Sequence, residues 1–115
     1  MSERERTIRE LLGKAVHVEV DRPIGYQHGD LVYPINYGYI PGILAGDGEE
    51  QDAYILGVSE PISAFEGRVI AAIRRLDDCE DKLVVAPEGA FFSADEIASA
   101  VRFQEQYFDS FVLTP

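Results

Sequence analysis

Three acidic residues follow one another closely in a glycine-rich segment: Asp47, Glu49 and Asp52. Carboxylates at this spacing repel one another unless a positive charge lies between them, and a hard divalent cation such as Mg²⁺ is the usual ligand of such a cluster. Asp47 and Glu49 are two residues apart, so they can face the same way on an extended segment, and Gly48 permits a tight turn. The spacing predicts an all-oxygen metal site, although a solvated acidic turn fits it equally well.

Four acids of a predicted hairpin form a second cluster: Asp77, Asp78, Glu80 and Asp81. Lys82 follows them directly. A charged hairpin tip is usually no more than a solvated turn. If the two acidic clusters lay at the ends of adjacent strands, however, they could together bind paired Mg²⁺ ions.

Tyr33 and Tyr37 lie shortly before the first acidic cluster. Aromatic residues in strands usually belong to the core, but phenol groups beside a metal held by acids would suit a substrate rich in phosphate oxygens. His17 and His28 are the only histidines and are far apart, so a two-histidine metal site has no support. The sequence contains no Gly-x-Ser-x-Gly, Walker A or dinucleotide-binding motif, and the first acidic cluster lacks the ligand series of an EF-hand.

The composition restricts the class of protein. The 115 residues predict one domain, residues 1–115, and the net charge of −11 argues against binding nucleic acid through a basic face. This charge does not exclude a phosphate substrate, because bound cations can reverse the local field. Cys79 is the only cysteine, which excludes a disulfide framework and a thiolate zinc site. The charged N-terminus and the lack of a long apolar run predict a cytoplasmic protein that does not enter a membrane.

Short segments of alternating or β-branched residues must position these groups. Five of them are predicted to be strands: 15–20, 31–40, 53–58, 67–73 and 83–86. Residues 21–30 are predicted to be a loop and 41–48 a turn-rich connection, and Pro34 and Gly38 are expected to bend the second strand. Such regular short strands are typical of a small barrel or sandwich, a mainly β (α+β) fold.

Capping patterns predict a helix at each end of the chain. Ser2 and Glu5 would begin a short helix over residues 2–12. Ser93 and Glu96 form a second capping-box pattern, before a segment with Ile97, Val101 and Phe108 near helical spacing. We expect this second helix, of about four turns, to cover an open side of the barrel.

The sequence YPINYGYIPGILAGDGEEQDAYILG, residues 33–57, resembles a segment of the soluble inorganic pyrophosphatase family. In that family Tyr-Pro-x-Asn-Tyr-Gly-Phe/Tyr-Ile precedes Asp-Gly-Asp-Pro-x-Asp. VHVEV at 16–20 is similar to the family's first strand, EDKLVVAP at 80–87 to its Asp-x-Lys-Leu strand, and QEQYFDS at 104–110 to its last helix. The resemblance implies a small five-stranded OB-like β-barrel with a C-terminal helix packed on it.

The resemblance also implies a function and a set of site residues. The function is Mg²⁺-dependent hydrolysis of pyrophosphate to two phosphates by a metal-activated water, with Mn²⁺ or Co²⁺ as other suitable ions. Glu49 matches the base that acts on the attacking water and forms the catalytic pair with Asp52. The implied metal-site acids are Glu19, Asp47, Glu49, Asp52, Asp77 and Glu80, with Asp78 and Asp81 as rivals of Asp77 and Glu80. The implied substrate-binding residues are Tyr33, Tyr37, Lys82 and Tyr107.

Two departures from the family pattern keep other functions open. The family's Lys-x-Glu pair and its arginine lie in an interval that is much shorter here, where Arg22 or His28 could replace one cation. Phe108 occupies the position of a lysine. A wider pocket could accept a nucleotide or another phosphoanhydride, or the protein could be a non-catalytic relative that binds metal or phosphate. A small barrel with many apolar side chains can also form a homo-oligomer.

Overall fold

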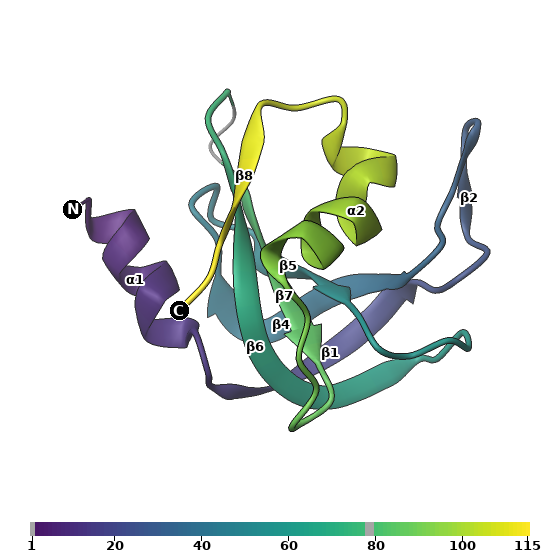
Figure 1. Ribbon diagram of the computed structural model, residues 1–115, viewed down its shortest axis with the longest axis horizontal. Helices are drawn as coiled ribbons and strands as arrows, with labels where there is room; N and C mark the ends of the chain where they lie inside the picture. The colour runs from purple at the N-terminus through teal and green to yellow at the C-terminus, as the bar shows by residue number, and fades with distance from the viewer. Residues whose placement is uncertain (1, 78–79) are drawn as a thin grey trace.

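The computed structural model describes residues 2–77 and 80–115 (Figure 1). The first helix, α1 (Glu3–Leu11), begins where the sequence predicts, because the Ser2 side chain accepts a hydrogen bond from the backbone N–H of Glu5. Ile8 is the buried residue of this helix and packs against the apolar interior of the barrel. The predicted N-terminal helix is therefore confirmed.

Five strands form a closed barrel, as the sequence predicts. They are β1 (Ala15–Arg22), β4 (Asn36–Leu44), β5 (Glu50–Ile55), β6 (Ala64–Arg75) and β7 (Asp81–Ala86). Their order is β1-β4-β5-β7-β6, and β6 pairs back with β1 to close the ring. All neighbours are antiparallel except β5 and β7, which run parallel. This parallel pair starts at one end of the barrel, directly after the two acidic turns.

Alternation along the strands separates the interior of the barrel from its outer face. Val16 and Val18 of β1 are buried in the interior, whereas His17 and Glu19 point outward. A second apolar cluster lies on the outer face beneath helix α2 (Ala94–Glu105), which covers this side of the barrel (Figure 1). It includes Tyr54 and Val84 from the strands and Ile97 and Val101 from the helix.

The second helix is confirmed but is shorter than predicted. Ser93 and Glu96 form the expected capping box, and the helix ends at Glu105, before Phe108. The chain then turns into β8 (Ser110–Leu113), a strand that the sequence analysis did not predict. β8 pairs with the C-terminal half of β6, so a tertiary contact decides its conformation. Neither helix of the described residues is long and apolar enough to cross a membrane.

The segment before β4 also differs from the prediction. A small hairpin of β2 (Gln27–His28) and β3 (Leu31–Val32) occupies part of the predicted loop and strand. β4 begins only at Asn36 and continues past Pro41 to Leu44, with an irregular register between Ile40 and Leu44. Proline has no N–H for the ladder, which is consistent with this irregularity.

Candidate active site

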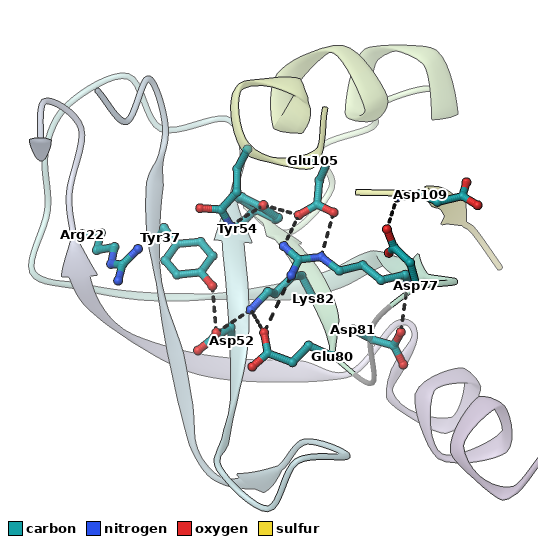
Figure 2. Close-up of polar contacts among 12 residues, drawn as sticks. Arg22, Tyr37, Asp52, Tyr54, Asp77, Glu80, Asp81, Lys82, Glu105 and Asp109 are labelled. Atoms are coloured by element: carbon teal, nitrogen blue, oxygen red, sulfur yellow. Dashed lines mark hydrogen bonds and ion pairs between the residues drawn. The ribbon is translucent and has the colours of Figure 1, made fainter. Parts of the chain in front are cut away.

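The two acidic turns meet because the strands that follow them are parallel neighbours. Ala53 of β5 lies opposite Leu83 of β7, so the preceding residues, Asp52 and Lys82, lie side by side on the outer face. Figure 2 shows Asp52 and Glu80 directed toward the same Lys82 ammonium group. The parallel pair β5–β7 therefore joins the two acidic clusters into one site.

A cavity of about 170 Å³ lies between the two turns. Its ionisable lining residues are Asp47, Glu49, Glu50, Asp52, Glu80, Asp81 and Lys82. The Asp47 carboxylate accepts the backbone N–H of Glu49 at 3.0 Å, and this bond, followed by a hydrogen bond with Glu80, lowers the pKa of Asp47. Asp47 from one turn and Glu80 from the other thus both line this acidic cavity.

Lys82 bridges the acids at the centre of the site. Its Nζ donates to Oδ2 of Asp52 at 2.7 Å and to Oε2 of Glu80 at 2.9 Å. Burial alone would lower the pKa of Lys82, but Tyr37 and the Asp52 carboxylate together outweigh burial and keep the pKa above its usual value. The Tyr37 hydroxyl donates to the same Asp52 oxygen at 2.7 Å, and burial raises the pKa of Tyr37. Asp52 therefore accepts from a protonated lysine and a neutral phenol.

A second cavity, of about 400 Å³, shares a wall with the first. Asp52, Glu80 and Lys82 line both cavities. The other residues that line the larger cavity are Asp21, Arg22, His28, Tyr37, Arg75, Gln104 and Phe108. Its lining thus combines three cationic side chains, those of Arg22, Arg75 and Lys82, with three acids. The cations could bind an anion if the acids bind a metal ion.

Two residues of α2 hold the two arginines in place. Gln104 accepts from the Tyr33 hydroxyl at 2.7 Å, and this hydroxyl in turn accepts from Nη1 of Arg22 at 2.6 Å. The next residue, Glu105, binds Nε and Nη2 of Arg75 at 3.0 and 2.7 Å. The Tyr54 hydroxyl links these two helix residues, because it accepts a hydrogen bond from Gln104 and donates one to Glu105.

Most of the site residues predicted from the sequence converge on these cavities. Those that line one or both are Asp47, Glu49, Asp52, Glu80, Lys82 and Tyr37. Tyr33 is buried behind Arg22 and does not line either cavity. Tyr107 is 71% exposed and lies outside both, whereas its neighbour Phe108 lines the larger cavity.

Two predicted metal ligands lie outside these cavities. Glu19 lies opposite Tyr39 of β4, and Tyr39 lies opposite Asp52 of β5, so Glu19 and Asp52 are on the same face of the sheet. The Glu19 carboxylate, however, is hydrogen-bonded to His17 at 3.0 Å. Asp77 accepts the backbone N–H of Asp109 at 3.0 Å.

Of their two rivals, Asp81 is buried and forms ion pairs with Arg4 and Arg74. The other rival, Asp78, lies outside the described residues. Among the described acids of this turn, Asp81 is thus neutralised by arginines, whereas Glu80 lines both cavities beside Lys82.

Arg75 is a cavity residue that the sequence analysis missed, as are Asp21, Glu50 and Gln104. Its place in the site depends on Glu105, thirty positions later in the chain, and on the register of β6 with β7. A pair of arginines at the end of a strand, Arg74 and Arg75, gives no local sign of which one faces the cavity. In the structure, the two side chains point to opposite sides of the strand: Arg74 pairs with Glu5 of α1, and Arg75 pairs with Glu105 of α2.

The donor set of the acidic cavity fits a hard divalent cation. Its acidic lining residues offer only carboxylate oxygens, which is the ligand type that Mg²⁺ prefers. Across the described residues, no three or more His, Cys, Asp and Glu side chains are already close enough together to hold a metal ion. The Lys82 ammonium lies between Asp52 and Glu80 instead, and it neutralises the acids that a cation would otherwise bring together.

Comparisons with known proteins show the family of the chain. The family model described as inorganic pyrophosphatase matches residues 5–111. Curated inorganic pyrophosphatases from Caulobacter vibrioides and Saccharolobus solfataricus are 29% identical over 85 residues and 38% identical over 72 residues. These matches cover 65% and 60% of this chain but only 48% and 40% of the relatives. The chain thus spans at most about half the length of these curated relatives.

Solved structures show the same fold. The inorganic pyrophosphatase from Ehrlichia chaffeensis aligns with a TM-score of 0.71 over 90% of this chain and 87% of its own, at 17% identity. The enzyme from Thermus thermophilus aligns with a TM-score of 0.58 over 88% and 80%, at 18% identity. At this identity the structures establish the barrel and its covering helix, and the family model establishes kinship. The chain therefore belongs to the inorganic pyrophosphatase family.

Proposed function

We propose that this protein hydrolyses inorganic pyrophosphate to two phosphates in a reaction that depends on Mg²⁺. The observation that carries the proposal is the pair of adjoining cavities, one lined mainly by acids and one that brings three cations beside acids, which share Asp52, Glu80 and Lys82. A metal-bound phosphoanhydride needs both environments side by side. Membership of the family supports the same reaction.

Carboxylates of the acidic cavity would hold the divalent cation. Asp47, Glu49, Asp52 and Glu80 come from two turns that already face each other, and Mn²⁺ or Co²⁺ could bind the same oxygens. When bound, such a cation supplies a water of lowered pKa and positive charge for the phosphoryl oxygens. Asp52 and Glu80 would exchange the Lys82 ammonium for this stronger charge.

Glu49 would accept the proton of the attacking water, as the resemblance to the family implies. Its side chain is exposed at the cavity and is one methylene longer than the aspartate of the family pattern. Tyr37 would keep Asp52 in position, because its hydroxyl donates to Oδ2 of that residue. The rate depends on where the Glu49 and Asp52 carboxylates lie, since a displacement of about 1 Å can lower it on the order of 10²-fold.

The larger cavity, which Arg22, Arg75 and Lys82 line, would bind the phosphates. Lys82 can turn from the acids to a phosphoryl oxygen, and Arg22, which lines the same space, is held by Tyr33. In this way Arg22 would supply the charge that the shortened interval before residue 33 otherwise lacks. Charged hydrogen bonds aimed at the phosphoryl oxygens stabilise the transition state as charge moves to the leaving phosphate.

Four further residues and two properties remain predictions. Glu19, Asp77, Tyr33 and Tyr107 are supported as functional residues by the resemblance alone. A cytoplasmic location and self-association into a homo-oligomer rest on composition. The residues that line the two cavities have, in addition, the support of their positions in the structure.

A substrate panel with a titration of Mg²⁺ tests the proposal. Phosphate release is measured from pyrophosphate, tripolyphosphate and a nucleoside triphosphate, each with and without Mg²⁺, Mn²⁺ or Co²⁺. The proposal expects metal-dependent release with pyrophosphate as the best substrate. A strong preference for a larger phosphoanhydride would replace pyrophosphate as the substrate, and metal-induced thermal stabilisation without any turnover would indicate a binding protein instead.

A further inference from the structure

Arg75 is a buried arginine at a cavity wall. It ends strand β6, its side chain is 3% exposed, and it lines the larger cavity together with Lys82 and Arg22. Glu105 binds the edge of the guanidinium formed by Nε and Nη2. On the other side, Nη1 lies 3.7 Å from Oε2 of Glu80, which is an acid of the cavity. The side of the guanidinium opposite Glu105 therefore faces the site.

Phe108 fixes the plane of this guanidinium. The Cζ atom of Arg75 lies 3.6 Å from the centroid of the Phe108 ring, and Phe108 lines the same cavity. Stacking on a ring and a bidentate carboxylate together restrict an arginine to one orientation, which reduces the entropy lost when it binds a further ligand. Arg75 is thus preorganised at the cavity wall.

An Arg75–Glu105 ion pair that only stabilised the fold would not need to border a cavity. The Arg75–Glu105 pair ties α2 to the barrel, and a buried ion pair of this kind is weak evidence for stability by itself. The pair is not enclosed by apolar residues, however, because Arg75 also approaches Glu80 and borders a cavity of about 400 Å³. A guanidinium in this setting matches a phosphoryl group, whose oxygens accept its planar donors.

We propose that Arg75 is a substrate-contacting cation, whose guanidinium contacts a phosphoryl oxygen in the larger cavity while Glu105 and Phe108 hold its orientation. Lys82 and Arg22 border the same space, so a ligand with two phosphoryl groups meets positive charge from β1, β6 and β7. The proposal deepens the proposed function and rests on it for the identity of the ligand.

Binding of methylenebisphosphonate, a pyrophosphate analogue that cannot be hydrolysed, tests this role without turnover. The variants E105Q and R75Q/E105Q are compared by isothermal titration calorimetry in the presence of Mg²⁺. Both variants lose the Glu105 charge and the original ion pair, but only the double variant loses the guanidinium. Arg68→Gln is the matched control, because Arg68 is on the same strand and pairs with Glu88 away from both cavities. Thermal unfolding confirms that each variant is folded.

We expect R75Q/E105Q to bind the analogue on the order of 10- to 100-fold more weakly than E105Q, the range of one charged hydrogen bond. Adding Phe108→Lys to the double variant should recover part of this loss, because a lysine there returns a charge to the same cavity wall. Equal affinities for E105Q and R75Q/E105Q, or no binding by the wild type, would overturn the proposal. Wild-type binding without pyrophosphate hydrolysis would refute the proposed function but would leave the role of Arg75 intact.

Discussion

Lys82 and Asp52 lie side by side at the start of two parallel strands, and 2.7 Å separates Nζ of the lysine from Oδ2 of the aspartate. The same nitrogen donates to Glu80, so one ammonium group neutralises an acid from each turn (Figure 2). A divalent cation that binds Asp52 and Glu80 must compete with this internal charge. Lys82 is therefore at once a partner of the acids and a rival of the metal.

Replacing Lys82 should separate these two effects. In Lys82→Gln the competing charge is gone, so we expect Mg²⁺ to bind severalfold more tightly, because a like charge beside a cation site weakens binding. Turnover of pyrophosphate should fall by about 10- to 100-fold, because one charged contact to the phosphate is lost. Calorimetric titration of Mg²⁺ and steady-state kinetics measure the two effects. Lys82→Arg, which keeps the charge, is the control, and weaker Mg²⁺ binding by Lys82→Gln would contradict the competition.

Tyr37→Phe should lower activity more than stability. The change removes the hydroxyl that donates to Asp52 but keeps the ring packed against Tyr54 and Tyr33. Loss of one hydrogen bond should reduce the free energy of unfolding by about 0.5–1.5 kcal/mol, since Asp52 keeps its bond to Lys82. Urea denaturation gives the stability, and kcat reports the position of Asp52. An unchanged kcat would show that the phenol has no part in positioning this acid.

His17 makes the stability of the fold depend on pH. Hydrogen bonds to Glu19 and then to Glu66 raise the pKa of His17 above its usual value. Because the folded-state pKa is the higher one, the contribution of protonated His17 is fully present below about pH 6.5, the unfolded value, and is lost as pH rises through the folded pKa. Unfolding at a series of pH values should show this fall in the wild type. His17→Gln should lack it, and identical pH profiles would contradict the assignment.

The barrel was predictable because its signals are local. Alternation places Val16 and Val18 inside and His17 outside, and the same reasoning identified the other four barrel strands. Ser93 with Glu96 fixed the start of α2 in the same way. The end of this helix was not predictable, because β8 exists only through its pairing with β6. Phe108, which borders the cavity in place of Tyr107, follows the end of this helix.

The candidate site was predictable where it depends on spacing within one turn. Asp47, Glu49 and Asp52 are close in the sequence and remain close in the fold, and the parallel pair β5–β7 joins them to Glu80. Arg75 could not be found in this way, because its position at the cavity depends on tertiary contacts with α2. The buried ion pairs of Asp81 likewise depend on arginines from other elements, so the sequence could not separate Asp81 from Glu80.

The measurement that tests the central claim most directly is phosphate release from pyrophosphate by the wild type and Asp52→Asn, each with and without Mg²⁺. Asp30→Asn is the matched control, because Asp30 lies in the turn between β2 and β3, away from both cavities. We expect turnover that requires Mg²⁺ in the wild type and in Asp30→Asn, and a loss of at least about 10²-fold in Asp52→Asn, whose amide has no charge to bind the metal. Equal turnover by Asp52→Asn and the wild type, or turnover that does not require a divalent metal, would contradict the account.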